Sequence, residues 1–197
     1  MNKDSTAFSA VRWTDVEDVL GYVNYDQPSK EIPGATLDLL HSQLLKIGVV
    51  FGSVSSGKEA KRLQFISPIL LEVCALFEGR VKIAVEEDLE GVNIHTNGHF
   101  EYVLELNNRK VCIVEAKKTD MEKGMAQALL GDETIADLDK ASEIYAIVTN
   151  YREWYFLKST DDAIYRDVYT LAVEHDIPSK ESVGTIASKI YGILSNA

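Results

Sequence analysis

The stretch from Asn97 to Lys118 constrains the fold of this chain more than any other, because its pattern fits a β-hairpin. Residues 100–106 alternate apolar and polar side chains as a strand does, and residues 111–114 form a short apolar run that fits a buried strand. Between them lies Asn107-Asn108, and asparagine adopts positive φ at low cost, so the pair is typical of a tight turn. The sequence therefore predicts two antiparallel strands joined at this turn.

Three charged side chains are expected to meet at one end of this hairpin. Glu115 ends the second strand, and Lys117 lies two residues further on, on the same face. Glu101 lies near the start of the partner strand and, with the turn where it is, nearly opposite Glu115. Two carboxylates and an amine are costly to hold together at one point, and a divalent cation would remove that cost.

Hard divalent cations such as Mg²⁺ and Mn²⁺ take oxygen ligands and usually retain waters. Glu101, Glu115 and the backbone carbonyl of Ala116 are therefore candidate metal ligands. Lys117 is a candidate for orienting a metal-bound water or for stabilising a transition state. An isolated E-x-K sequence is common, and its alternative interpretation is a solvated strand end with a salt bridge.

Hydrophobic periodicity predicts the other elements. The expected helices are Trp13–Val23, Ala35–Ile47, Lys58–Phe77, Thr119–Leu138, Asp161–His175 and Ser182–Leu194. The expected further strands are Val81–Val85, Glu143–Thr149 and Trp154–Leu157. Pro68 predicts a kink or a break in the third of these helices.

This order predicts an α/β fold with a central mixed sheet of about five strands and helices on both faces. A length of 197 residues fits one domain. We divide it into an N-terminal helical extension (1–57), a core (58–160) and C-terminal helices (161–197).

The core resembles the PD-(D/E)XK nuclease superfamily, the restriction-endonuclease-like enzymes with an αβββαβ core. In the resemblance, Glu101 takes the place of the usual aspartate, and His99-Phe100 stand before it where a proline is common. The segments V-C-I-V-E-A-K-K and G-M-A-Q-A-L-L are similar to the nuclease-like domains of fungal and oomycete Crinkler-type proteins.

The resemblance implies metal-dependent hydrolysis of phosphodiester bonds in nucleic acid, DNA more than RNA. It assigns the (D/E)XK element to Glu115, Ala116 and Lys117. It also assigns a glutamine on the following helix to Gln127 and a further metal ligand on the first core helix to Glu72. Pairing with a second copy is expected too, because many relatives act as dimers.

A catalytically degenerate nuclease fold that serves as a binding or effector module is the main alternative. The glutamate in place of aspartate and the net charge of −11 motivate it. That charge also argues against broad electrostatic binding of nucleic acid.

A third interpretation rests on Gly52 to Lys58, which matches the nucleotide-binding pattern G-x-x-x-x-G-K after the apolar run 47–51. Glu59 stands where serine or threonine would bind Mg²⁺, and its carboxylate would repel a phosphate. The alternative is a serine- and glycine-rich loop that caps the helix after it.

Two histidines, His95 and His99, lie four residues apart, with Asn97-Gly98 between them, so a helical metal-binding pair is not expected. His99 lies two residues before Glu101 on the same strand face and is a candidate extra metal ligand. A loop or partly buried histidine is the alternative.

Composition bears on whether the chain is a membrane, secreted or intracellular protein. No apolar run approaches the ~18 residues of a membrane span, and residues 1–10 contain no secretory leader pattern. Cys74 and Cys112 lie inside apolar runs and are expected to be buried free thiols. We therefore expect an intracellular protein, cytoplasmic or nuclear, without membrane contact.

Overall fold

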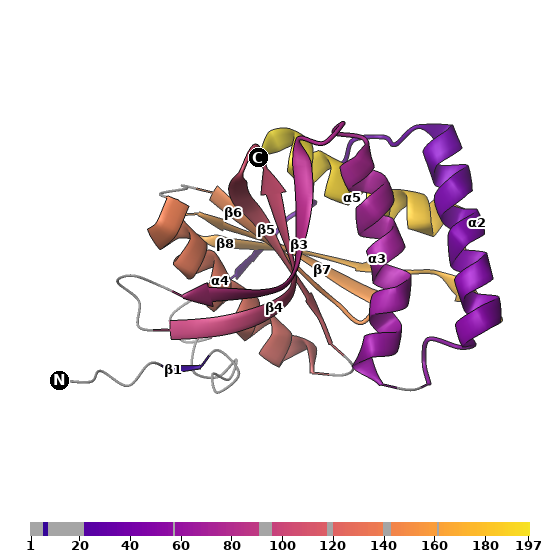
Figure 1. The fold of residues 1–197 in the computed structure, drawn as a ribbon, viewed down its shortest axis with the longest axis horizontal. Helices are drawn as coiled ribbons and strands as arrows, with labels where there is room; N and C mark the ends of the chain where they lie inside the picture. Colours follow the sequence, from indigo (N-terminus) through magenta and orange to yellow (C-terminus); the bar gives the residue numbers. More distant parts are fainter. Residues whose placement is uncertain are drawn as a thin grey trace.

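The structure is a computed structural model that describes residues 6–7, 22–56, 58–90, 96–117, 120–139, 143–160 and 162–197. A mixed central sheet lies between two layers of helices (Figure 1). The helix α4 covers one face, and α2, α3 and α5 cover the other. The predicted α/β class is therefore confirmed.

The described helices are α2 (Gly34–Phe51), α3 (Glu59–Ala75), α4 (Met121–Asp139) and α5 (Lys180–Asn196). The strands are β1 (Thr6–Ala7), β2 (Tyr22–Asn24), β3 (Val81–Glu90), β4 (Thr96–Leu106), β5 (Arg109–Ala116), β6 (Glu143–Thr149), β7 (Glu153–Thr160), β8 (Ile164–Thr170), β9 (Val173–Glu174) and β10 (Ile177–Pro178). The large sheet has the order β1-β4-β5-β6-β7-β8-β2, and β3 pairs with β4; β9 and β10 form a separate pair.

The predicted hairpin is confirmed in strands β4 and β5. Asn107 and Asn108 have φ values of 52° and 65°, the left-handed conformation that asparagine tolerates. Tyr102 lies opposite Val114 in the register of the two strands. Strand β5 then pairs in parallel with β6, so its carboxyl end lies inside the sheet rather than at an edge.

The predicted helix Asp161–His175 is wrong, because residues 164–170 form β8, antiparallel to β7. Their apolar spacing suits a helix, but the β-branched and aromatic residues that create it also favour strands, and the open edge of β7 decides the outcome. Strand β8 and the short strands β1 and β2 make the described sheet eight-stranded rather than about five-stranded.

The other helix predictions agree with α2, α3, α4 and α5 to within a few residues. Helix α3 runs through Pro68 without a break. The predicted helix Trp13–Val23 lies outside the described residues, except at its end, where Tyr22–Asn24 form β2. Cys74 and Cys112 are free and buried, as expected.

Small residues let α4 lie close to the sheet. A Cβ on Gly131 would lie 2.5 Å from both Ile113 Cδ1 and Phe100 Cζ. A Cβ on Gly124 would lie 2.6 Å from Val148 Cγ1. Glycine at these two positions therefore sets the distance between α4 and strands β4 to β6.

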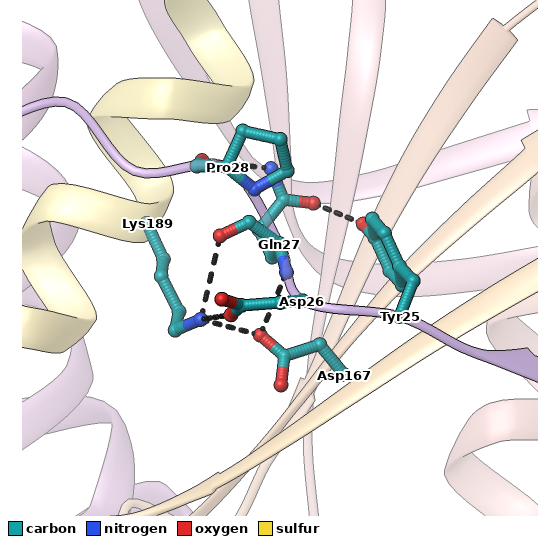
Figure 2. A network of polar contacts seen from close by, with 6 residues as sticks. All are labelled: Tyr25, Asp26, Gln27, Pro28, Asp167 and Lys189. Carbon is teal, nitrogen blue, oxygen red and sulfur yellow. Dashed lines mark hydrogen bonds and ion pairs between the residues drawn. The ribbon is translucent and has the colours of Figure 1, made fainter.

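A polar network fixes the segment after β2 to the C-terminal helix (Figure 2). The buried Lys189 Nζ of α5 donates to Asp167 Oδ2 at 2.6 Å, to Asp26 Oδ1 at 2.9 Å and to the carbonyl oxygen of Gln27 at 3.3 Å. Tyr25 donates from its hydroxyl to Gln27 Oε1. This network joins segments that lie more than a hundred residues apart in the sequence.

In the described part of the chain, none of the helices combines the length and the apolar character that crossing a membrane requires.

Candidate active site

The candidate site lies at the carboxyl end of β5. Glu115 is the second-last residue of this strand and points to the α4 side, as Ile113 does. The backbone N–H of Lys117 donates to the carbonyl oxygen of Thr149 on β6 at 2.8 Å. This bond extends the pairing beyond β5 and holds the backbone of Lys117 beside the sheet.

Glu115 is buried, with 2% of its surface exposed. Its Oε1 accepts a hydrogen bond and ion pair from Lys117 Nζ. Its Oε2 is also buried but has no hydrogen-bond partner among the described residues. A buried acceptor without a partner costs about 1–3 kcal/mol, so this oxygen is available to a ligand.

Glu101 reaches the same point from β4. Its Oε2 accepts a hydrogen bond of 3.1 Å from the backbone N–H of Ala116. Burial, reinforced by the proximity and charge of the Glu101 carboxylate, raises the pKa of Glu115 to about 9, and Lys117 opposes the rise. The structure therefore brings Glu101, Glu115 and Lys117 together, as the hairpin register predicts.

Burial alone would lower the pKa of Lys117, but the charges of Glu115, Glu101 and Glu59 outweigh it and raise this pKa. Lys117 is therefore a cation at neutral pH. It can donate hydrogen bonds and stabilise negative charge, but it cannot accept a proton as a base.

The glutamate of α3 that acts on Lys117 is Glu59, in the first turn of the helix, and not the predicted Glu72. Glu72 lies 13 residues further along α3, about 20 Å along the helix axis. Its Oε1 accepts a hydrogen bond of 2.8 Å from Gln43 Nε2 of α2. The structure does not bring Glu72 into the site; an acidic residue where the helix begins was the signal for Glu59.

Helix α4 closes the site from the other side. A Cβ on Gly124 would lie 2.9 Å from Lys117 Cγ, so this turn of the helix touches the lysine. Gln127 lies one turn further on the same buried side. Its Oε1 is buried and has no partner among the described residues, which makes it a second available oxygen.

The site contains few carboxylates for a metal site. No three side chains of histidine, cysteine, aspartate or glutamate gather closely enough in the described residues to hold a metal by themselves. Mg²⁺, however, is commonly bound through one or two carboxylates, with waters and substrate oxygens completing its shell. The pair Glu101 and Glu115 fits that kind of site, and the carbonyl of Ala116 stays a predicted ligand.

His99 is not part of this cluster in the structure. Its Nε2 lies 2.5 Å from Glu86 Oε2 and its Nδ1 lies 2.9 Å from Asp88 Oδ1, both on β3. These two carboxylates raise the pKa of His99. With both ring nitrogens engaged, the ring has no free electron pair for a metal; His95 lies outside the described residues.

The segment from Gly52 to Lys58 does not have the strand that a nucleotide-binding loop needs before it, because residues 47–51 belong to helix α2. Two residues of this segment instead accept hydrogen bonds from a lysine of the following helix. Lys61 Nζ donates to the carbonyl oxygen of Ser53 at 2.6 Å and to Ser56 Oγ at 3.1 Å. The structure therefore gives no support to the nucleotide-binding interpretation.

No family model matches the chain. Over 193 residues, which are 98% of the chain, the sequence is 45% identical to Crinkler effector protein 5 of Phytophthora infestans. The matched region is 55% of that protein, so the chain spans about half the length of this relative. The chain is homologous to this effector protein, which confirms the expected similarity to Crinkler-type proteins; the relation to PD-(D/E)XK nucleases stays a prediction.

Proposed function

We propose that this homologue of a Crinkler effector protein is a divalent-metal-dependent nuclease that hydrolyses phosphodiester bonds of nucleic acid, most of all DNA. The observation that carries the proposal is the buried Oε2 of Glu115, which has no partner among the described residues although Glu101 and Lys117 lie beside it. A structural salt bridge would not need a second carboxylate or an open oxygen.

Glu101 and Glu115 would hold Mg²⁺ or Mn²⁺, because a cation between the two carboxylates would offset both the burial and the repulsion from Glu101 that raise the pKa of Glu115. Such a cation, when bound, lowers the pKa of a coordinated water and stabilises charge on a phosphate. The carbonyl of Ala116 is the proposed third oxygen. Glu59, rather than Glu72, is the α3 carboxylate placed to act on this site.

Lys117 would hold its proton throughout, because its pKa is raised. Once Glu115 shares its charge with a cation, the ammonium group of Lys117 can donate a hydrogen bond to the attacking water or to a phosphate oxygen. That donation orients the water and stabilises the negative charge of the transition state.

Gln127 would complete the site as a positioning residue. Its buried Oε1, without a described partner, can accept a hydrogen bond from the water or from Lys117. Its place on α4 fixes this oxygen, since the helix is held against the sheet by Gly124 and Gly131.

The order of elements from α3 through β3, β4, β5 and α4 to β6 supports the proposed relation to the PD-(D/E)XK superfamily. In this chain the last two of these elements, α4 and β6, form an αβ unit, and β6 pairs in parallel with β5, the strand that carries the E-x-K segment. A fold alone does not establish an activity, so the nuclease function rests on the cluster of Glu101, Glu115 and Lys117 as well as on the fold.

The test is cleavage of labelled single- and double-stranded DNA and RNA with Mg²⁺ or Mn²⁺ and with EDTA. Wild type is compared with Glu115→Gln and Lys117→Met. Each variant should lose cleavage by about 100-fold or more, the usual cost of removing one group that stabilises the transition state. The matched control is Glu143→Gln, which breaks an ion pair with Lys158 at the start of β6, the opposite end from the site, and should leave cleavage unchanged.

Calorimetric titration of the same proteins with Mn²⁺ distinguishes a metal-dependent nuclease from a catalytically degenerate nuclease fold. Binding to wild type but not to Glu115→Gln, together with cleavage, supports the nuclease. Absence of both binding and cleavage on every substrate would instead favour a degenerate nuclease fold that acts as a binding or effector module. Cleavage that persists in both site variants would contradict the assigned residues.

A further inference from the structure

Strand β3 has an open edge. It runs for ten residues, Val81–Glu90, and in the part of the chain that the structure describes its one partner strand is β4. Val85 on this strand is 60% exposed. A long edge with exposed apolar side chains is a template for pairing with another strand.

The regular part of this edge is short and has a defined end. The register with β4 stays constant from Val85 opposite Tyr102 to Glu87 opposite Phe100, and the ladder is interrupted only at Glu86 between them. Glu86 has a φ of 54°, which lies outside the extended conformation of a strand, so the regular strand geometry of this edge ends there. Regular pairing on the outer side is therefore available from Val81 to Val85.

The residues along this edge are self-complementary. Arg80 stands at one end of the regular stretch and Glu86 at the other, both exposed, with Val81, Ile83 and Val85 between them on one face. His99 Nε2 lies 2.5 Å from Glu86 Oε2 and leaves the glutamate side chain 60% exposed. A strand with a cation at one end and a carboxylate at the other matches an antiparallel copy of itself.

We propose that two copies of the chain pair through their β3 edges, antiparallel, about a two-fold axis at Ile83. This register places Ile83 opposite its own symmetry mate and Val81 opposite Val85 of the second copy. Arg80 then lies opposite Glu86, twice by symmetry. The contact closes on itself, since the same edge is used on both chains.

An apolar hollow beside the edge supports a partner here. Ile83 and Val85 line a cavity of about 640 Å³ together with Pro68 and Leu71 of α3 and Tyr102 of β4. Leu71 is 57% exposed. A contiguous apolar surface of this kind marks an interaction site, and the second copy brings its own Val81 and Leu71 beside it.

The first test measures mass by light scattering after size exclusion, over a range of protein concentrations. Wild type should move from the mass of one chain to that of two, whereas Val85→Lys should weaken association by about tenfold or more, because it places a charge in the apolar centre. Val85→Thr is the matched control. It keeps the β-branched shape and should still form the dimer.

The second test fixes the register by exchanging charges. Arg80→Glu and Glu86→Lys should each weaken association, because like charges then face each other. The double variant, with both charges exchanged, should restore it. Circular dichroism and thermal midpoints, compared across the set, show that the variants remain folded.

Three outcomes would overturn the proposal. If wild type stays a single chain at all concentrations, the β3 edge does not pair with a second copy, and a strand of another protein becomes the candidate partner. A dimer that survives Val85→Lys would use another surface. A double charge variant no better than the single variants would contradict this register.

Discussion

Asp132 shows how one residue can be buried at a cost that depends on pH. It is 1% exposed on α4, and its Oδ2 accepts a hydrogen bond of 2.6 Å from Ser159 of β7, while its Oδ1 has no partner among the described residues. Burial raises the pKa of Asp132 from 3.8 to about 8, against the lowering effect of Ser159. The folded chain therefore keeps a proton on Asp132 that the unfolded chain releases.

We predict that the free energy of unfolding falls as pH rises from about 4 to about 8, by about 1 kcal/mol per pH unit from this group, because the folded state binds the extra proton over that range. Asp132→Asn, which cannot ionise, should remove this contribution and raise stability at pH 7.5, while the smaller slope that remains comes from the raised pKa of Glu115. Urea unfolding at several pH values measures it.

The control for Asp132 is its exposed neighbour, Glu133→Gln, which should keep the wild-type slope. An Asp132→Asn variant whose stability falls with pH as steeply as wild type would show that another group carries the dependence.

At the scale of elements, the contact between α4 and the sheet depends on glycine at particular positions. The sequence alone marks Gly131 only as a weak point of a helix. The structure shows that its hydrogen is the atom that fits against Ile113 and Phe100. A Cβ on Gly48, in α2, would meet nothing within 4 Å apart from its chain neighbours and the backbone of its own helix.

The same substitution should therefore have opposite effects in the two helices. Gly48→Ala should raise the free energy of unfolding by about 0.5–1 kcal/mol, the ordinary gain in a helix. Gly131→Ala should lower it by about 1–3 kcal/mol, because the added methyl group overpacks the core. Thermal and urea unfolding measure both, and equal signs would contradict the close packing.

Local pattern was enough to predict the β4–β5 hairpin, its asparagine turn and the meeting of Glu101, Glu115 and Lys117. Those features depend on residues near each other in sequence. The strand β8 and the true place of Glu72 were not predictable in this way. Residues 164–170 fit two kinds of element, and the open edge of β7 chooses between them. Glu72 lies on a helix, and the direction in which its side chain points depends on how α2 and α3 pack together.

At the scale of the whole molecule, Lys189 ties the C-terminal helix α5 to the segment that follows β2. Its ammonium group is buried and holds Asp167 and the segment at Asp26 and Gln27 (Figure 2). On the same side, Gly192 leaves room for Pro28, because a Cβ there would lie 2.1 Å from the Pro28 carbonyl oxygen. The chain segment after β2 is thus seated on α5 by charge and by shape.

Lys189→Met should lower the free energy of unfolding by about 1–3 kcal/mol, less than a fully buried pair because Asp26 is exposed to solvent and screened. Lys180→Met is the control, since Lys180 pairs with exposed Asp38 and should change stability by less than about 0.5 kcal/mol. Urea unfolding compares them, and similar losses in the two variants would contradict the anchoring role.

The two-residue turn at Asn107-Asn108 also bears on the order in which the molecule folds. It lets Glu101 meet Glu115 after closing a short loop, which loses little chain entropy, and Gln127 follows on the next helix. Strands β4, β5 and β6 are complete once Thr149 has been synthesised. The contacts of Lys189 form only after the chain has grown by 40 more residues. On a ribosome, the cluster of Glu101, Glu115 and Lys117 is therefore expected to form before the fold around it is locked.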